Sequence, residues 1–81
     1  RRRHRRLILR MPWNSTYRSE LVKKMESAGI VIIDQAYHRH ESLNEMDVTI
    51  DIGYTDSAKF EALEAELRDG QQVKLMVSER A

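Results

Sequence analysis

Apolar and polar residues alternate along three stretches of the chain. The longest is MDVTIDIGY, residues 46–54, in which every second residue is apolar or aromatic and the residues between are Asp, Thr, Asp and Gly. Shorter alternations occupy residues 7–11, LILRM, and residues 73–77, VKLMV. Because successive side chains of a strand point to opposite faces of its sheet, each stretch predicts a strand with one buried face.

A fourth strand is predicted to begin at Ile30, where four β-branched residues, Ile30–Ile33, follow one another. A short run of this kind favours a central strand, or one that is buried on both faces. The polar segment ESLNE, residues 41–45, separates this strand from the next. A connection this short predicts a β-hairpin.

Two further stretches repeat apolar residues at the spacing of an α-helix, PWNSTYRSELVKKMESAG at residues 12–29 and TDSAKFEALEAELRDG at residues 55–70. The apolar positions are Tyr17, Leu21, Val22, Met25 and Ala28 in the first stretch and Phe60, Leu63 and Leu67 in the second. Each stretch has polar side chains that can cap a helix, Asn14, Ser15 and Thr16 in the first and Thr55, Asp56 and Ser57 in the second. Each closes with a glycine that can end a helix. Both therefore predict amphipathic helices.

The predicted order of elements is strand, helix, strand, strand, helix, strand. This is the order of the ferredoxin-like α+β fold, in which two helices cover one face of a four-stranded antiparallel sheet. The third strand of such a sheet lies beside the first. We therefore expect Arg6 and Arg10 to face Asp47 and Asp51 on the uncovered side of the sheet.

Length and charge separate a basic start from an acidic body. The 81 residues suffice for one small domain, and no apolar run approaches the length of a membrane span. Five arginines occur in the first six residues, and the rest of the chain holds nine Lys or Arg against thirteen Asp or Glu. We interpret residues 1–5 as a basic linker, cut from a longer chain, in which Arg1 to His4 are disordered. We expect residues 6–81 to form the folded domain.

The residues offer little support for catalysis, nucleic-acid binding or a metal site. The chain has no cysteine, no glycine-rich phosphate loop and no His-Glu pair at helical zinc spacing, so we expect a protein that is not an enzyme. The third strand carries acids where an RNA-binding sheet carries stacking aromatics, so no nucleic-acid partner is expected. His38 and His40 share a face of the second strand and are weak candidates for metal ligands. We expect no metal or other cofactor.

The loop after the first strand contains the one tryptophan of the chain, Trp13. A large aromatic side chain in this loop either covers the edge of the core or lines a pocket. In the second case, a small metabolite such as an amino acid is held near Trp13, Asn14, Ser15 and the facing residues Asp34 and Gln35.

The run VKKMESAGIVIIDQAYHR, residues 22–39, passes from a helix through a glycine into a hydrophobic strand. Together with the order of elements it resembles ACT domains, which are small regulatory modules of this topology, and the resemblance covers residues 7–78. It implies that residues 6–81 form an ACT-like regulatory domain. ACT domains that bind amino acids usually carry an acid and a glycine in the loop after the first strand. Here that loop is MPWNSTY, with neither, so the sequence departs from this family pattern at the effector loop.

The arginine-rich start, this loop and an ACT-like body are together similar to the C-terminal cytoplasmic domain of the MgtC/SapB family of bacterial membrane proteins. The resemblance implies a regulatory role in adaptation to low magnesium, in survival inside macrophages and hence in virulence. It also implies a location on the cytoplasmic side of the bacterial inner membrane, directly after a membrane domain. There the basic residues Arg1, Arg2, Arg3, Arg5 and Arg6 would contact anionic lipid.

Three hypotheses of function follow from these observations. The first is a regulatory domain that contacts another protein, its own membrane domain or a second copy of itself as a homodimer. The second is an ACT-type small-molecule sensor of a metabolic or transport protein. The third is a divalent-metal binder that uses His38, His40 and nearby carboxylates.

Overall fold

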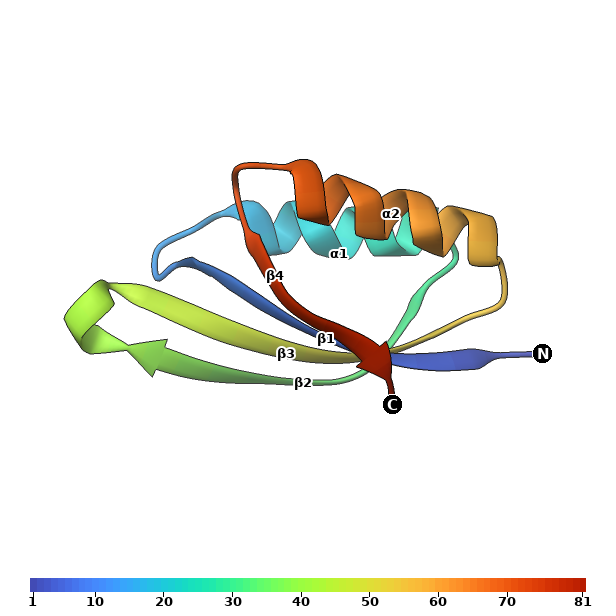
Figure 1. Cartoon of the computed structure of the whole chain (residues 1–81), viewed down its shortest axis with the longest axis horizontal. Helices are drawn as coiled ribbons and strands as arrows, with labels where there is room; N and C mark the ends of the chain where they lie inside the picture. Colours follow the sequence, from blue (N-terminus) through green and yellow to red (C-terminus); the bar gives the residue numbers. More distant parts are fainter.

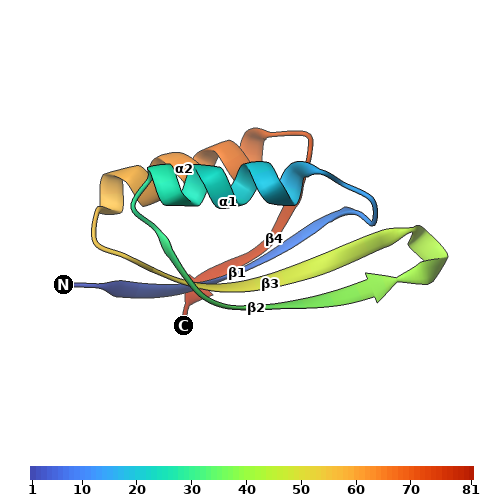
Figure 2. The same cartoon turned by 180° about the vertical axis from the view of Figure 1, so that it is seen from behind.

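The computed structural model describes residues 1–81 (Figure 1 and Figure 2). Its elements are β1 (Arg3–Pro12), α1 (Tyr17–Ser27), β2 (Val31–His40), the short 3-10 helix η1 (Glu41–Leu43), β3 (Glu45–Tyr54), α2 (Ser57–Asp69) and β4 (Lys74–Arg80). The strands form one antiparallel sheet in the order β2, β3, β1, β4, and both helices lie on the same face of it (Figure 1). The predicted ferredoxin-like α+β fold is confirmed.

The core lies between the helices and the face of the sheet that they cover. Every second residue from Met46 to Tyr54 is buried there, as the alternation in the sequence predicts. Sixteen buried hydrophobic residues form one cluster: Leu7, Leu9, Met11, Tyr17, Leu21, Met25, Ile30, Met46, Val48, Ile50, Ile52, Tyr54, Phe60, Leu63, Leu67 and Val73. Burial of each large side chain contributes about 1.5–3 kcal/mol, which makes this single cluster the main source of stability.

Strand β1 begins earlier than the sequence predicts. The expectation that residues 1–4 are disordered is contradicted at Arg3 and His4, which pair with Tyr54 and Gly53 of β3. The physical reason is that β3 continues to Tyr54, so its last backbone groups need partners, and the basic segment supplies them. The side chain of Arg2 also lies against Gly53, at a place that a Cβ atom would fill.

Strand β2 lies at the edge of the sheet and is exposed on most of its length, which corrects the expectation of a central or doubly buried strand. Val31 is 44% exposed and Ile33 is 53% exposed. The strand pairs with β3 alone, and its register shifts between Ile32 and Asp34. The hairpin that it forms with β3, closed by η1, extends past the N-terminal end of α1 (Figure 1).

The predicted capping and terminating residues of the helices are confirmed in part. Asp56 caps α2, since its carboxylate accepts a hydrogen bond from the backbone N–H of Lys59 at 3.1 Å. Thr16 holds the equivalent position at α1 but makes no side-chain cap bond. Gly29, which follows the C-cap residue Ala28 of α1, has a φ of 69°, a left-handed conformation that costs glycine little. Neither helix has the length and apolar character required to cross a membrane.

Candidate functional site

A groove of about 380 Å³ runs between α1 and strand β2. Its floor is apolar and consists of side chains from the helix and the two nearest strands, among them Leu21, Met25 and Ile50. Its rim is polar and carries Ser15, Arg18, Ser19, Gln35 and Tyr37. The groove exists because β2 is the outermost strand, so the helix does not cover it completely.

Arg18, Tyr37 and Gln35 form a chain of hydrogen bonds along this rim. The Arg18 Nη2 donates to the Tyr37 hydroxyl at 2.7 Å, and this hydroxyl donates to the Gln35 Oε1 at 2.8 Å. The Arg18 guanidinium also lies 4.2 Å from the centre of the Tyr37 ring, within the range of a cation–π contact. No carboxylate of the chain forms an ion pair with Arg18.

This arrangement suits a small ligand with a negative group and an apolar body. A guanidinium has five N–H donors, and only one of those of Arg18 is used in the chain of hydrogen bonds. A carboxylate can accept two hydrogen bonds from an arginine side by side, while apolar atoms of the same molecule contact the floor. The groove therefore has both the charge and the apolar surface that such a ligand requires.

The structure brings together only two of the five residues predicted to bind a metabolite. Ser15 and Gln35 both line the groove. Asp34 precedes Gln35 in the same strand, so its side chain belongs to the opposite face of the sheet. Its partner in the register of β2 and β3 is Asp51, which lies on that uncovered face. Asn14 is exposed and does not line the groove.

Trp13 is half-buried at the edge of the core, which agrees with the alternative that it covers the core rather than lines a pocket. The guanidinium of Arg39 lies 4.2 Å from the centre of the Trp13 ring system. The backbone N–H of Trp13 donates to the carbonyl of Asn44 at 3.0 Å, which ties the loop after β1 to the end of the β2–β3 hairpin.

The sequence-based interpretation missed Arg18 and Tyr37, which form the centre of the rim. The available signal was weak: Tyr37 is an aromatic residue that shares a face of β2 with Gln35, and Arg18 lies in the first turn of a helix. A contact between the two depends on how the helix lies over the strand, and this is a property of the assembled fold.

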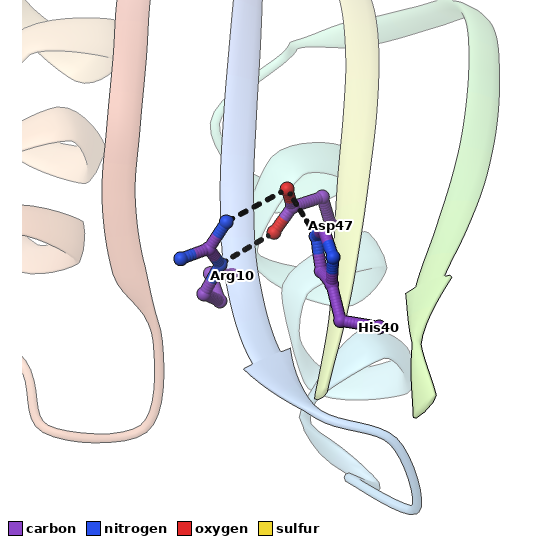
Figure 3. Close-up of polar contacts among 3 residues, drawn as sticks. All are labelled: Arg10, His40 and Asp47. Atoms are coloured by element: carbon purple, nitrogen blue, oxygen red, sulfur yellow. Dashed lines mark hydrogen bonds and ion pairs between the residues drawn. The ribbon is translucent and has the colours of Figure 1, made fainter. Parts of the chain in front are cut away.

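The uncovered face of the sheet carries the expected arginine–aspartate pairs. Arg6 donates to Asp51 from Nε at 2.7 Å and from Nη2 at 3.0 Å. Arg10 donates to Asp47 in the same manner, at 2.8 and 3.1 Å (Figure 3). These pairs join the central strands β1 and β3, and the expectation that the four residues face one another is confirmed.

Asp47 has a second partner, since the His40 Nε2 lies 2.8 Å from Oδ2, the oxygen that also accepts from Arg10 Nη2 (Figure 3). The hydrogen bonds from Arg10, followed by that of His40, lower the pKa of Asp47 to about 2 from its ordinary value of 3.8. The Arg6 guanidinium lowers the pKa of Asp51 in the same way. Both carboxylates are therefore charged over the whole physiological range.

The two candidate metal ligands, His38 and His40, lie together on this face with their rings in contact. The rings of His38 and His40 meet edge to face with centres 4.6 Å apart. No group of three or more His, Cys, Asp or Glu residues is arranged to hold a metal ion.

The basic residues of the first strand do not form one surface. Because strand side chains alternate, Arg5 belongs to the helix side and Arg6 to the uncovered side. Arg5 donates to the Ser78 hydroxyl at 2.7 Å, and Arg6 is held by Asp51. Basic residues at the end of the sheet surround a separate hollow of about 420 Å³, which is lined by Arg1, Arg2, Arg3, His4, Arg5, Tyr54 and Arg80.

Comparison with known proteins supports the fold. No protein-family model matches the chain, and no curated protein is significantly similar to it in sequence. Among solved structures, the uncharacterized protein TM1266 from Thermotoga maritima superposes with a TM-score of 0.66 at 15% sequence identity. The match covers 96% of this chain and 98% of that one. The chain thus shares its whole fold with a bacterial protein of distant sequence.

Proposed function

We propose that this chain is a non-enzymatic regulatory domain that senses a small apolar carboxylate, such as an amino acid or a 2-oxo acid, in the groove between α1 and β2. The observation that carries the proposal is the Arg18 guanidinium, which lies at the rim of an apolar groove and has no carboxylate of the chain as a partner. The resemblance to ACT domains supports a regulatory role.

The coupling of a ligand to the rest of a larger protein would run through β2. This strand contributes Gln35 and Tyr37 to the rim, and its outer edge has no neighbouring strand. A ligand that contacts both α1 and β2 fixes the edge strand against the helix. A partner that recognises this edge then binds a better ordered surface.

The test is a titration of the 15N-labelled chain with leucine, phenylalanine and 4-methyl-2-oxopentanoate, followed by NMR. We expect the largest shifts at Arg18, Gln35 and Tyr37. Replacement Arg18→Gln should weaken binding by about tenfold or more, because a charge-assisted hydrogen bond is lost. The control Lys23→Gln removes one positive charge from the same helix outside the groove and should leave binding unchanged. Absence of shifts at the groove with all three compounds would contradict the proposal.

A second candidate function places the domain next to a membrane, as the cytoplasmic part of an MgtC-type protein that acts in adaptation to low magnesium and in virulence. The specific observation in its favour is the basic end of the sheet, where Arg1, Arg2, Arg3 and Arg80 have no ion-pair partners. Each Lys or Arg near an anionic membrane contributes about 1 kcal/mol of attraction. Arg5 and Arg6 contribute less, since both have partners within the fold.

Flotation with vesicles tests this candidate. We expect the chain to bind vesicles that contain phosphatidylglycerol and to remain free with phosphatidylcholine alone. The triple variant R1Q/R2Q/R3Q should lose binding, whereas the matched variant K23Q/K59Q/R68Q, with changes on the helices, should retain it. Equal binding by the two triple variants would contradict a contact through the basic end of the sheet.

A further inference from the structure

The uncovered face of the sheet has a pattern of charge that is complementary to itself. Strand β1 presents Arg6, Ile8 and Arg10 in sequence, and the register of the sheet sets Asp51, Thr49 and Asp47 of β3 directly beside them. One strand is therefore basic and its neighbour acidic, at matched heights. The four charges sum to zero, so a second copy of the same surface is not repelled by net charge.

The four charged side chains retain capacity for further hydrogen bonds. Each guanidinium has five N–H donors, and each of these two uses a donor on Nε and one on Nη2 for its aspartate. A carboxylate accepts up to about four hydrogen bonds, and Asp51 accepts two here. The side chains of Asp51 and Asp47 are 23% and 21% exposed, so both remain accessible from outside the sheet.

From this pattern we propose that the uncovered face binds a second copy of the chain, face to face, about a twofold axis that runs parallel to the strands between β1 and β3. This operation lays β1 of each copy over β3 of the other. Arg6 then lies over Asp51 of the second copy, Arg10 over Asp47, and Ile8 over Thr49. Each aspartate lies between two guanidinium groups, one from its own sheet and one from the other. A twofold interface requires this self-complementarity.

The outer strands distinguish this axis from its alternative. In the proposed arrangement β2 lies over β4 of the other copy, which brings Asp34 toward Glu79 at the level of the Arg6–Asp51 pair. A twofold axis perpendicular to the strands would instead bring Glu79 toward Lys74 and would lay Arg6 over Arg10. The charges of the central strands thus favour the first axis. The like charges that it brings together, Asp34 and Glu79, lie on the outer strands, where two stacked, twisted sheets are farther apart.

Sedimentation equilibrium of the 81-residue chain at low and high salt tests the proposal. We expect reversible dimers that weaken as salt is added, because exposed charge pairs are screened. Arg6→Glu should weaken the dimer by about tenfold or more, since it places like charges in contact across the interface. Lys23→Glu, an equal change of charge on a helix, should have no effect. Glu79→Lys should strengthen the dimer by removing the repulsion from Asp34.

Arg6→Glu also sets a carboxylate between Asp51 and Glu79 of the same sheet, so its folding must be checked by circular dichroism. The variant R6D/R10D/D47R/D51R avoids this difficulty because it exchanges the charges and retains both pairs inside each sheet. We expect it to form dimers with itself but none with the wild-type chain. A wild-type chain that stays monomeric at low salt, a Glu79→Lys variant that associates no better, or free mixing of the exchanged and wild-type chains would each overturn the proposal.

Discussion

Arg10 holds Asp47 by two parallel hydrogen bonds, from Nε at 2.8 Å and from Nη2 at 3.1 Å, across the two central strands of the sheet. The residues are partners in the register of β1 and β3, so the backbone already sets them opposite each other. The pair therefore needs little further ordering to form, which distinguishes it from most ion pairs at a protein surface.

Replacement Asp47→Asn should destabilise the domain in a manner that depends on pH. The folded state lowers the pKa of this carboxylate to about 2, below its ordinary value of 3.8. The stabilisation is thus complete above pH 3.8 and is lost as the pH falls through 2. We expect a loss of about 2 kcal/mol at neutral pH, measured by urea unfolding, which disappears in strong acid. The control Asp69→Asn, at an exposed residue without an ion pair, should change the stability at neutral pH by less than about 0.5 kcal/mol.

The two helix starts should respond differently to removal of their capping side chains. Asp56→Ala removes an observed hydrogen bond to the backbone of α2 and should cost about 1 kcal/mol. Thr16→Ala removes no such bond from α1 and should cost less than about 0.5 kcal/mol. Thermal unfolding of the two variants beside the wild type measures both values. Equal losses would show that the cap bond at Asp56 contributes nothing specific.

Gly29 should tolerate asparagine better than any β-branched residue. Its φ of 69° is strained for residues with a Cβ atom, although nothing lies within 4 Å of the place where that atom would be. The cost is therefore one of backbone conformation, about 1 kcal/mol for alanine and more for valine. Asparagine enters this conformation more readily and should cost less than alanine. Urea unfolding of the three variants gives the order, and a smaller loss for valine than for asparagine would contradict this explanation.

Two neighbouring residues of β1 should differ sharply when they are shortened. Leu9 is fully buried in the core, and Leu9→Ala should cost about 2–5 kcal/mol through lost contacts and the cavity left behind. Ile8 points to the uncovered face and is only partly buried, so Ile8→Ala should cost about 1 kcal/mol or less in the monomer. Unfolding is to be measured at a protein concentration low enough to exclude self-association. Similar losses for the two variants would mean that the uncovered face is not open in the single chain.

The sequence predicted most clearly those parts of the fold in which one face is buried. The alternation from Met46 to Tyr54 places β3, and the order of elements sets β1 beside it, which brings the arginines of one strand next to the aspartates of the other. It failed where composition disguised a strand, because a run of arginines resembles a linker, although the backbone of Arg3 pairs as readily as any other. It failed also at β2, where β-branched residues that suit a buried strand lie instead at an exposed edge.

Most residues of the candidate groove could not be predicted from the sequence. Gln35 was identified, but its neighbour Asp34 could not share its direction, since adjacent residues of a strand point to opposite faces. Arg18 and Tyr37 come from different elements, and their contact depends on the distance that the core sets between α1 and β2. Such contacts arise from packing, and residue patterns within one element do not encode them.

The position of β1 between β3 and β4 bears on how the domain forms during synthesis. Arg5, near one end of the chain, lies opposite Arg80, near the other. The strand that is made first therefore acquires its second neighbour, β4, last, and the edge of β1 that β4 covers stays open until most of the chain has been made. Contacts between parts of a chain that are distant in sequence slow folding, and they lengthen the time for which apolar segments and unpaired strand edges are exposed. A nascent chain halted before Lys74 would carry β1 with one open edge, a natural substrate for chaperones.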